Sequence, residues 1–272
     1  MKVIDTVTEL FEALGWRTGA ARYLRLVALI AATTGACVAA ALAVAEATSI
    51  SVVLLQALIW VAWLFWLGVV FPRNRRRDMA SPGAYPYRRA FFREILLGIS
   101  VAFSQFLRPA AAGLLEGGIS LPPASALLIG VSLLAGGAAM IAVGVSALGV
   151  SRTLFVHEYV LGRREVVRAG IYRFVRHPLF IGGALVSLGL AICTGAAVAI
   201  EAGLVNALAC PLYARLEDRR CIAILGDEYL DYSADVGGVV PRRRSAIRPA
   251  AQLRHAAGST EPIAGRAQVS KR

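Results

Sequence analysis

The sequence predicts an all-α, polytopic membrane protein with about six transmembrane helices, the last two forming a helical hairpin. Of its 272 residues, 57% are hydrophobic and only 17% are charged, and the mean hydropathy is +0.64. Its apolar runs are near the length of about 20 residues that a helix needs to cross a hydrocarbon core of about 30 Å. The basic residues gather between these runs. This combination excludes an ordinary soluble domain.

The net charge of +12 is explained by membrane topology rather than by nucleic-acid binding. Most arginines lie in short segments between spans and in the tail, as the positive-inside rule predicts for cytoplasmic loops. Four cysteines show no CxxC pair, and three of them lie inside apolar runs. The cysteine spacing therefore predicts no metal site, and the placement of the arginines predicts no nucleic-acid partner.

Residues 1–22 form an N-terminal amphipathic segment. Apolar residues recur there at helical spacing, with Asp5, Glu9 and Glu12 on the other side. This pattern predicts a helix that lies along the membrane interface.

Residues 23–148 hold four predicted spans, at about 26–45, 50–71, 95–115 and 124–148. The Arg-rich segment 72–89 between the second and third spans is expected to be a hydrated cytoplasmic loop, whereas the connections near 46 and 116–123 carry no Lys or Arg and should face outward. Glycines in the fourth span indicate close helix packing; they are Gly130, Gly136, Gly137 and Gly144.

Two charged residues, Arg108 and Glu201, fall inside apolar runs near the outer face. Charges in a membrane are costly enough to need a partner. The two would pair with each other, or Arg108 would pair with Glu46 or Glu116, in a structural role.

Residues 149–241 combine a basic cytoplasmic loop, an apolar hairpin and a C-terminal amphipathic segment. The apolar stretch 179–213 is interrupted at Cys193-Thr194-Gly195, which predicts a turn between two short arms. The tail 242–272 is rich in Arg, Ala, Gly and Pro without periodicity, which is typical of disorder. Six spans place both termini and every basic segment in the cytoplasm, and the Arg and Ala bias favours a bacterial inner membrane.

The most informative feature is a pair of polar clusters that flank this hairpin. Residues 168–183 read RAGIYRFVRHPLFIGG, and after the apolar stretch come Glu217-Asp218 and then LGDEYLDYSADVGGVVP at 225–241. Because the ends of a hairpin meet at one membrane face, both clusters should form one site at the water boundary.

These three segments, in this order, resemble the isoprenylcysteine carboxyl methyltransferase family and its phospholipid N-methyltransferase relatives. The family pattern is GPYRxxRHPxYxG, then a Glu-Glu pair, then FGxxYxxYxxxVP, and the resemblance covers about 144–241. It implies a membrane enzyme that binds S-adenosylmethionine near the cytoplasmic face and methylates a lipid-like or prenylated acceptor. The matched cofactor-binding positions are Tyr172, Arg176, His177, Pro178, Gly182, Glu217 and Asp218.

The chemistry of the cofactor agrees with these residue types. S-adenosylmethionine carries a sulfonium, an ammonium and a carboxylate, so its pocket needs acidic groups and a basic group. Glu217 and Asp218 would bind the ribose hydroxyls or the ammonium, and Arg176 or His177 the carboxylate. The chain departs from the family pattern at Ile171, Phe180 and Asp218, where the family has Pro, Tyr and Glu.

Arg215 precedes the acidic pair by two residues, as is common in the carboxyl-methylating branch. The resemblance implies that Arg215 orients an acceptor carboxylate in catalysis, and the alternative is a snorkelling arginine at a helix end. A carboxylate acceptor would need positioning and desolvation rather than a strong base.

Two other functions fit the same sequence. One is an NADPH-dependent membrane reductase similar to the C-terminal region of sterol reductases, and the other is a non-catalytic membrane scaffold. The acceptor and the oligomeric state stay open at this point.

Overall fold

The protein is all-helical in the residues that its computed structural model describes, which are 3–81, 83, 85–116, 122–160 and 165–241. The predicted tail at 242–272 and most of the loop after Glu116 lie outside them. Five helical segments are long and apolar enough to cross a membrane: Ala20–Thr48, Val52–Ala80, Pro86–Leu115, Ala124–Leu148 and Ala197–Leu225. A shorter apolar helix, Pro178–Thr194, brings the number of apolar helices among these residues to six. The predicted fold class is confirmed.

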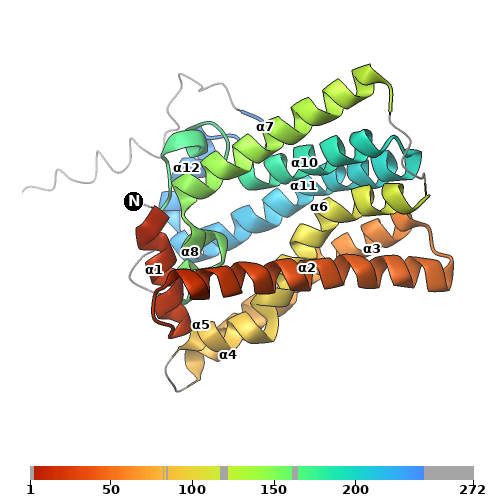
Figure 1. The fold of residues 1–272 in the computed structure, drawn as a ribbon. Helices are drawn as coiled ribbons and strands as arrows, with labels where there is room; N and C mark the ends of the chain where they lie inside the picture. The colour runs from red at the N-terminus through yellow and green to blue at the C-terminus, as the bar shows by residue number, and fades with distance from the viewer. Residues whose placement is uncertain (1–2, 82, 84, 117–121, 161–164, 242–272) are drawn as a thin grey trace, which may run out of the picture. The chain divides into compact units, whose positions relative to one another are not determined.

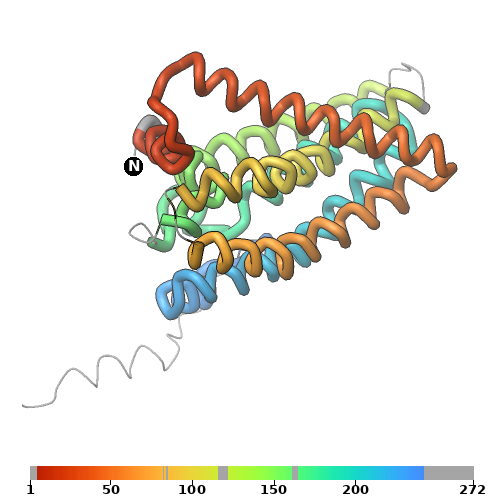
Figure 2. Tube along the Cα trace, turned by 90° about the horizontal axis from the view of Figure 1, so that it is seen from below, coloured from red at the N-terminus to blue at the C-terminus, as the bar shows by residue number. Residues whose placement is uncertain are grey.

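Most of these long segments run side by side, as Figures 1 and 2 show. The first is α2 (Ala20–Thr48), followed by α3 (Val52–Phe65), α6 (Leu96–Glu116) and α7 (Ala124–Leu148). The hairpin consists of α10 (Pro178–Thr194) and α11 (Ala197–Leu225), and α10 packs mainly against α7, α11 and α6. Short elements gather at one end; they are α1 (Val3–Leu14), α8 (Val150–Thr153), α9 (Val156–Tyr159), a 3-10 turn (Gly170–Arg173) and α12 (Asp227–Asp235).

The second and third spans extend into the predicted Arg-rich loop. Helix α3 continues through a π-helical turn (Trp66–Val70) into α4 (Phe71–Ala80), and α5 (Pro86–Ala90) continues through another (Phe91–Ile95) into α6. The prediction of a loop over 72–89 is therefore wrong for most of its length. The helices persist because Asp78 on α4 is buried and accepts two hydrogen bonds of 2.8 Å from Arg93 on the third span.

Helix α1 is amphipathic, but protein rather than lipid covers its apolar face. Leu10, Phe11 and Leu14 are at most 1% exposed and belong to the main core. The backbone N–H of Val150 donates to the hydroxyl of Thr6 on α1, at 3.2 Å. The rest of the chain therefore covers the apolar face of α1, and the position of α1 along the membrane interface stays a prediction.

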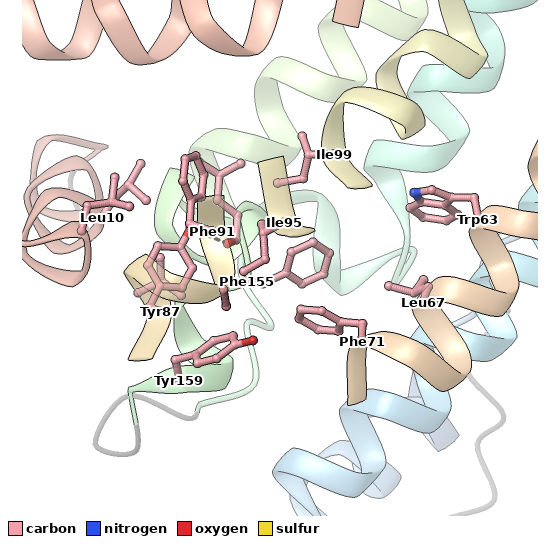
Figure 3. Packing of buried hydrophobic residues seen from close by; sticks show 14 of the residues in the cluster. Leu10, Trp63, Leu67, Phe71, Tyr87, Phe91, Ile95, Ile99, Phe155 and Tyr159 are labelled. Atoms are coloured by element: carbon pink, nitrogen blue, oxygen red, sulfur yellow. Dashed lines mark hydrogen bonds between the residues drawn. The ribbon is translucent and has the colours of Figure 1, made fainter. Parts of the chain in front are cut away.

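The main core is aromatic and lies beneath the end where the short elements gather. Figure 3 shows Phe71, Tyr87, Phe91, Phe155 and Tyr159 packed together. The hydroxyl of Tyr87 donates to the carbonyl of Leu154, at 2.9 Å. This core ties the segment after α7 to α4 and α5.

The α7 and α10 helices pack closely through glycines spaced seven residues apart. A Cβ on Gly137 would lie 2.6 Å from the carbonyl oxygen of Gly182, and one on Gly189 would lie 2.6 Å from that of Gly130. Such distances are incompatible with a side chain, so only glycine permits this packing. The predicted close helix approach is present at Gly137 and Gly130, whereas Gly136 faces open space.

Arg108 is buried in a network of neutral polar groups. Its guanidinium donates to the side-chain oxygens of Gln56, at 2.7 Å, and of Gln105 and Ser104, each at 3.0 Å. Glu201 and Glu46 are exposed and neither is bonded to Arg108, so these two predicted ion pairs are wrong. The side chain of Glu116 lies outside the described residues.

Candidate active site

The hairpin brings the two sequence motifs together at its charged end. Helix α10 begins at Pro178 with His177 as its N-cap, and Asp218 lies on α11 opposite. Asp218 accepts hydrogen bonds from Arg176 Nη2 at 2.6 Å and Nε at 3.1 Å, and from His177 Nε2 at 2.8 Å. Tyr229 on α12 adds a fourth, at 2.7 Å. Both oxygens of Asp218 are therefore occupied within the protein.

Helix α11 carries Asp218 because it is longer than the sequence analysis predicts. Gly195, with φ of 72°, ends α10 in the left-handed conformation that favours glycine, and α11 then runs for 29 residues. The predicted short second arm is wrong, since the apolar part and the acidic pair belong to one helix. The acidic pair is thus fixed rigidly relative to the start of α10.

A backbone clasp closes the site from the C-terminal side. The amides of Arg176 and His177 donate to the carbonyl of Gly238, at 3.1 and 3.2 Å. The guanidinium of Arg176 also donates to the carbonyl of Ser233, at 2.9 Å, and to that of Val236. The end of α12 and the segment that follows it therefore order the RHP motif, Arg176-His177-Pro178, directly.

Glu217 lies beside Asp218 but has different partners. Its Oε2 atom accepts from the hydroxyl of Tyr213, at 2.8 Å, and from Arg220 Nη1, at 3.1 Å. Its Oε1 atom has no hydrogen-bond partner within the described parts of the chain. Glu217 therefore offers one carboxylate oxygen to a ligand.

A cavity of about 730 Å³ opens beside these residues, a volume within the range of about 300–1,000 Å³ that is usual for small-molecule sites. Its polar end is lined by the motif residues and by the segment after α7; the residues are Arg152, His157, Glu165, Tyr172, Arg176, His177, Pro178, Glu217, Tyr229 and Tyr232. Phe180 and Tyr213 line its middle, with ring centroids 3.7 Å apart. The polar and apolar parts form one continuous space.

The other end of the cavity is apolar and lies among α2, α6, α7 and α10. Its lining residues are Val27, Ile30, Ala31, Thr34, Gly35, Ile99, Ala102, Phe103, Phe106, Leu107, Ile141, Val145, Leu148, Leu179 and Val186. Val27, Phe103 and Leu107 are 46%, 44% and 43% exposed. The apolar end therefore reaches the side of the helical bundle.

Two residues that the sequence analysis assigns to the site lie elsewhere. Gly182 faces α7, where a Cβ would lie 2.8 Å from the carbonyl oxygen of Gly137, and it does not line the cavity. Its neighbour Gly183 does line it. Arg215 is exposed and also does not line the cavity. This environment is the one expected for the alternative, an arginine that snorkels at a helix end.

The structure adds site residues that the sequence analysis misses. Arg220 bonds to Glu217, and its spacing of three residues on one helix is the signal that would have revealed it. Arg152 faces the cavity from α8, where the sequence shows only a basic loop. Neither belongs to the motif segments.

Buried phenols supply hydrogen-bond donors at the polar end. Burial raises the pKa of Tyr172, and Tyr232 and Glu217 add to the effect. Burial likewise raises the pKa of Tyr229, with Cys221 and Asp218 adding to it. Both phenols are therefore protonated at neutral pH. The hydroxyl of Tyr172 is buried and has no hydrogen-bond partner among the described residues, so it is free to bond to a ligand.

These residues fit the polar groups of S-adenosylmethionine. The free Glu217 oxygen is an acceptor for hydroxyl or ammonium groups, and the Tyr172 hydroxyl has an unused hydrogen bond. The cavity has room for a nucleoside and joins an apolar space. A nucleoside with a cationic side chain matches this set of donors and acceptors.

The family model described as phospholipid methyltransferase matches residues 125–226. This range covers α7, the RHP motif, the hairpin and the acidic pair. No curated protein and no solved structure matches the chain.

Proposed function

We propose that this chain, whose residues 125–226 belong to the phospholipid methyltransferase family, transfers a methyl group from S-adenosylmethionine to an amphiphilic acceptor. The family match itself indicates a membrane methyltransferase. The observation that carries the finer proposal is the single cavity, which joins a polar end built from the motif residues to an apolar end that reaches the side of the bundle. Such a space suits a polar cofactor beside a lipid-like chain.

Glu217 and Tyr172 would contact the cofactor directly. The free Oε1 atom of Glu217 would accept from the ribose hydroxyls or the ammonium, and the unpartnered hydroxyl of Tyr172 would donate to a cofactor oxygen. Pro178 and His177 would form part of the wall. Bound there, S-adenosylmethionine supplies an electrophilic methyl group on a sulfonium.

Asp218 would affect the cofactor only indirectly, because both of its carboxylate oxygens already accept hydrogen bonds within the protein. It holds Arg176 at 2.6 Å and His177 at 2.8 Å, so it would set the orientation of both cavity-lining side chains. The replacement of Glu by Asp in this pair is compatible with this role, because Asp218 reaches both partners.

The acceptor would be an amphiphile with one extended apolar chain. The lining residues Ile99 and Leu107 lie eight positions apart on α6, or about 12 Å at 1.5 Å per residue. A chain lying there would leave the bundle between exposed side chains such as Phe103. The acceptor would therefore enter from the bilayer rather than from water.

A carboxylate remains the proposed reactive group of the acceptor. Since Arg215 does not line the cavity, Arg152 is the better-placed cation, because it faces the polar end and is only partly buried. A carboxylate needs no base for methyl transfer, so the protein's contribution would be alignment and exclusion of water.

The polar end of the cavity would face the cytoplasm of a bacterial inner membrane. The arginines of α4 and α5 lie at this end, and the positive-inside rule places such residues on the cytoplasmic side.

Calorimetric titration of the detergent-purified chain with S-adenosylmethionine tests the cofactor. We expect Glu217→Gln and His177→Ala to weaken binding at least tenfold, and the control Asp231→Asn, an exposed residue of α12, to bind like the wild type. Unchanged binding in both site variants, or binding of NADPH without S-adenosylmethionine, would overturn the proposal. Transfer of labelled methyl to extracted membrane lipids would then identify the class of acceptor.

A further inference from the structure

Behind Glu217, a chain of alternating charges leads away from the cavity into the protein. The first link is Arg220, whose Nη1 atom lies 3.1 Å from Glu217 Oε2. Its other terminal nitrogen bonds to the carboxylate of Glu158 on α9. The last link is Arg75 on α4, whose Nε atom lies 3.5 Å from Glu158 Oε2. These ion pairs thus connect α4 and α9, through Arg220 on α11, to the carboxylate of Glu217.

The guanidinium of Arg220 is packed between two aromatic rings as well as bonded to two carboxylates. It lies 5.1 Å from the ring centroid of Phe71 and 5.0 Å from that of Phe155. Figure 3 shows these two rings next to each other in the aromatic core, with their centroids 5.4 Å apart. Rings on the cation and carboxylates at both ends fix the plane of the guanidinium.

Glu158 is the most deeply buried member of this charge chain. Its side chain is 3% exposed, compared with 9% for Arg220 and 22% for Glu217. Arg75 Nε also donates to the backbone carbonyl of Glu158, at 2.9 Å. Breaking a buried pair by removing one partner leaves an uncompensated charge, so the remaining groups rearrange.

The function of Glu217 depends on which of its oxygens faces the cavity. The bonds from Tyr213 and Arg220 both end on Oε2, which leaves Oε1 for a ligand. Without Glu158, Arg220 would have Glu217 as its only carboxylate partner among the described residues. Both terminal nitrogens of the guanidinium could then bond to Glu217, one to each oxygen, and Oε1 would no longer be available to a ligand in the cavity.

We propose that Glu158 is a positioning residue of the active site: acting through Arg220, it fixes the carboxylate of Glu217 so that one oxygen is presented to the cofactor. Glu158 does not line the cavity. This inference rests on the proposed function, because it assigns Glu217 to cofactor binding.

A double-mutant cycle in cofactor binding tests the inference. We expect Glu158→Gln to weaken S-adenosylmethionine binding about tenfold, and Glu158→Gln with Glu217→Gln to bind no more weakly than Glu217→Gln alone, because coupled residues are not additive. Asp231→Asn serves again as the control. Thermal unfolding of each variant is measured in parallel.

The outcomes separate the two proposals. A wild-type chain that does not bind the cofactor overturns the proposed function itself. If the wild type binds, then wild-type affinity in Glu158→Gln, or fully additive losses in the double variant, overturns the positioning role and leaves the function standing. If Glu158→Gln does not fold, Glu158→Asp replaces it in the same cycle, since it keeps the charge and shortens the reach by one methylene.

Discussion

The glycine packing between α7 and α10 predicts that a single added methyl group destabilises the protein. In Gly182→Ala, the new Cβ would lie 2.8 Å from the carbonyl oxygen of Gly137, and in Gly137→Ala it would lie 2.6 Å from that of Gly182. Reaching an ordinary contact of 3.4 Å requires the two helices to separate by about 0.6–0.8 Å, and such overpacking costs about 1–3 kcal/mol. Backbone atoms form the obstacle, so rotation of a side chain cannot relieve it.

The matched control is Gly136→Ala, because nothing lies within 4 Å of a Cβ at that position. Alanine there should be neutral or stabilising by up to about 1 kcal/mol through its higher helix propensity. Unfolding is followed in mixed micelles by titration with SDS. Equal unfolding midpoints for Gly182→Ala and Gly136→Ala would refute the reasoning. Since α10 carries His177 at its start, Gly182→Ala should also weaken cofactor binding, whereas Gly136→Ala should not.

Three further predictions follow from the packing and the polar network. Leu14→Ala on α1 should lower the free energy of unfolding by about 2–5 kcal/mol in the same SDS titration; an unchanged unfolding midpoint would contradict the packing of α1 against the core. Arg108→Leu should lower the free energy of unfolding by at least about 2 kcal/mol because it leaves buried acceptors without a donor. Glu201→Gln, at an exposed position, should leave the thermal midpoint unchanged. Similar losses of stability in both variants would contradict the bonding of Arg108 to neutral groups. Tyr229→Phe should cost about 1–2 kcal/mol through its lost bond to Asp218. Because burial raises the pKa of Tyr229 above its unfolded value of about 10, the stability difference between wild type and this variant should hold up to about pH 9 and shrink above pH 10, and a difference that grows there would contradict the protonated donor.

The number and order of the apolar helices follow from the sequence because hydropathy reports directly on them. Their ends do not, as the segment 72–89 illustrates. Its arginines indicate water, but Phe71 and Asp78 are buried and keep the chain helical as far as Ala80. The packing of α1 on the core also does not follow from the sequence, because an amphipathic pattern does not reveal whether lipid or protein covers the apolar face.

The candidate site follows from the sequence as a meeting of two motifs, and the structure does bring Arg176 and His177 beside Asp218. The different roles proposed for Glu217 and Asp218 do not follow from the sequence, because they depend on which carboxylate oxygens are already bonded. Among the residues that the structure describes, Glu217 has one oxygen without a hydrogen bond, whereas both oxygens of Asp218 are bonded. Nor does sequence spacing reveal that Glu158 reaches Arg220, since 62 residues separate them.

The clasp between the RHP motif and the carbonyls of Val236 and Gly238 has a consequence for biosynthesis. The residues that accept hydrogen bonds from Arg176 are synthesised after both hairpin helices, because Val236 follows Arg176 by 60 residues. The bonds that order Arg176 and His177 can therefore form only once this later segment has been translated, so the candidate site is completed after the hairpin has been synthesised.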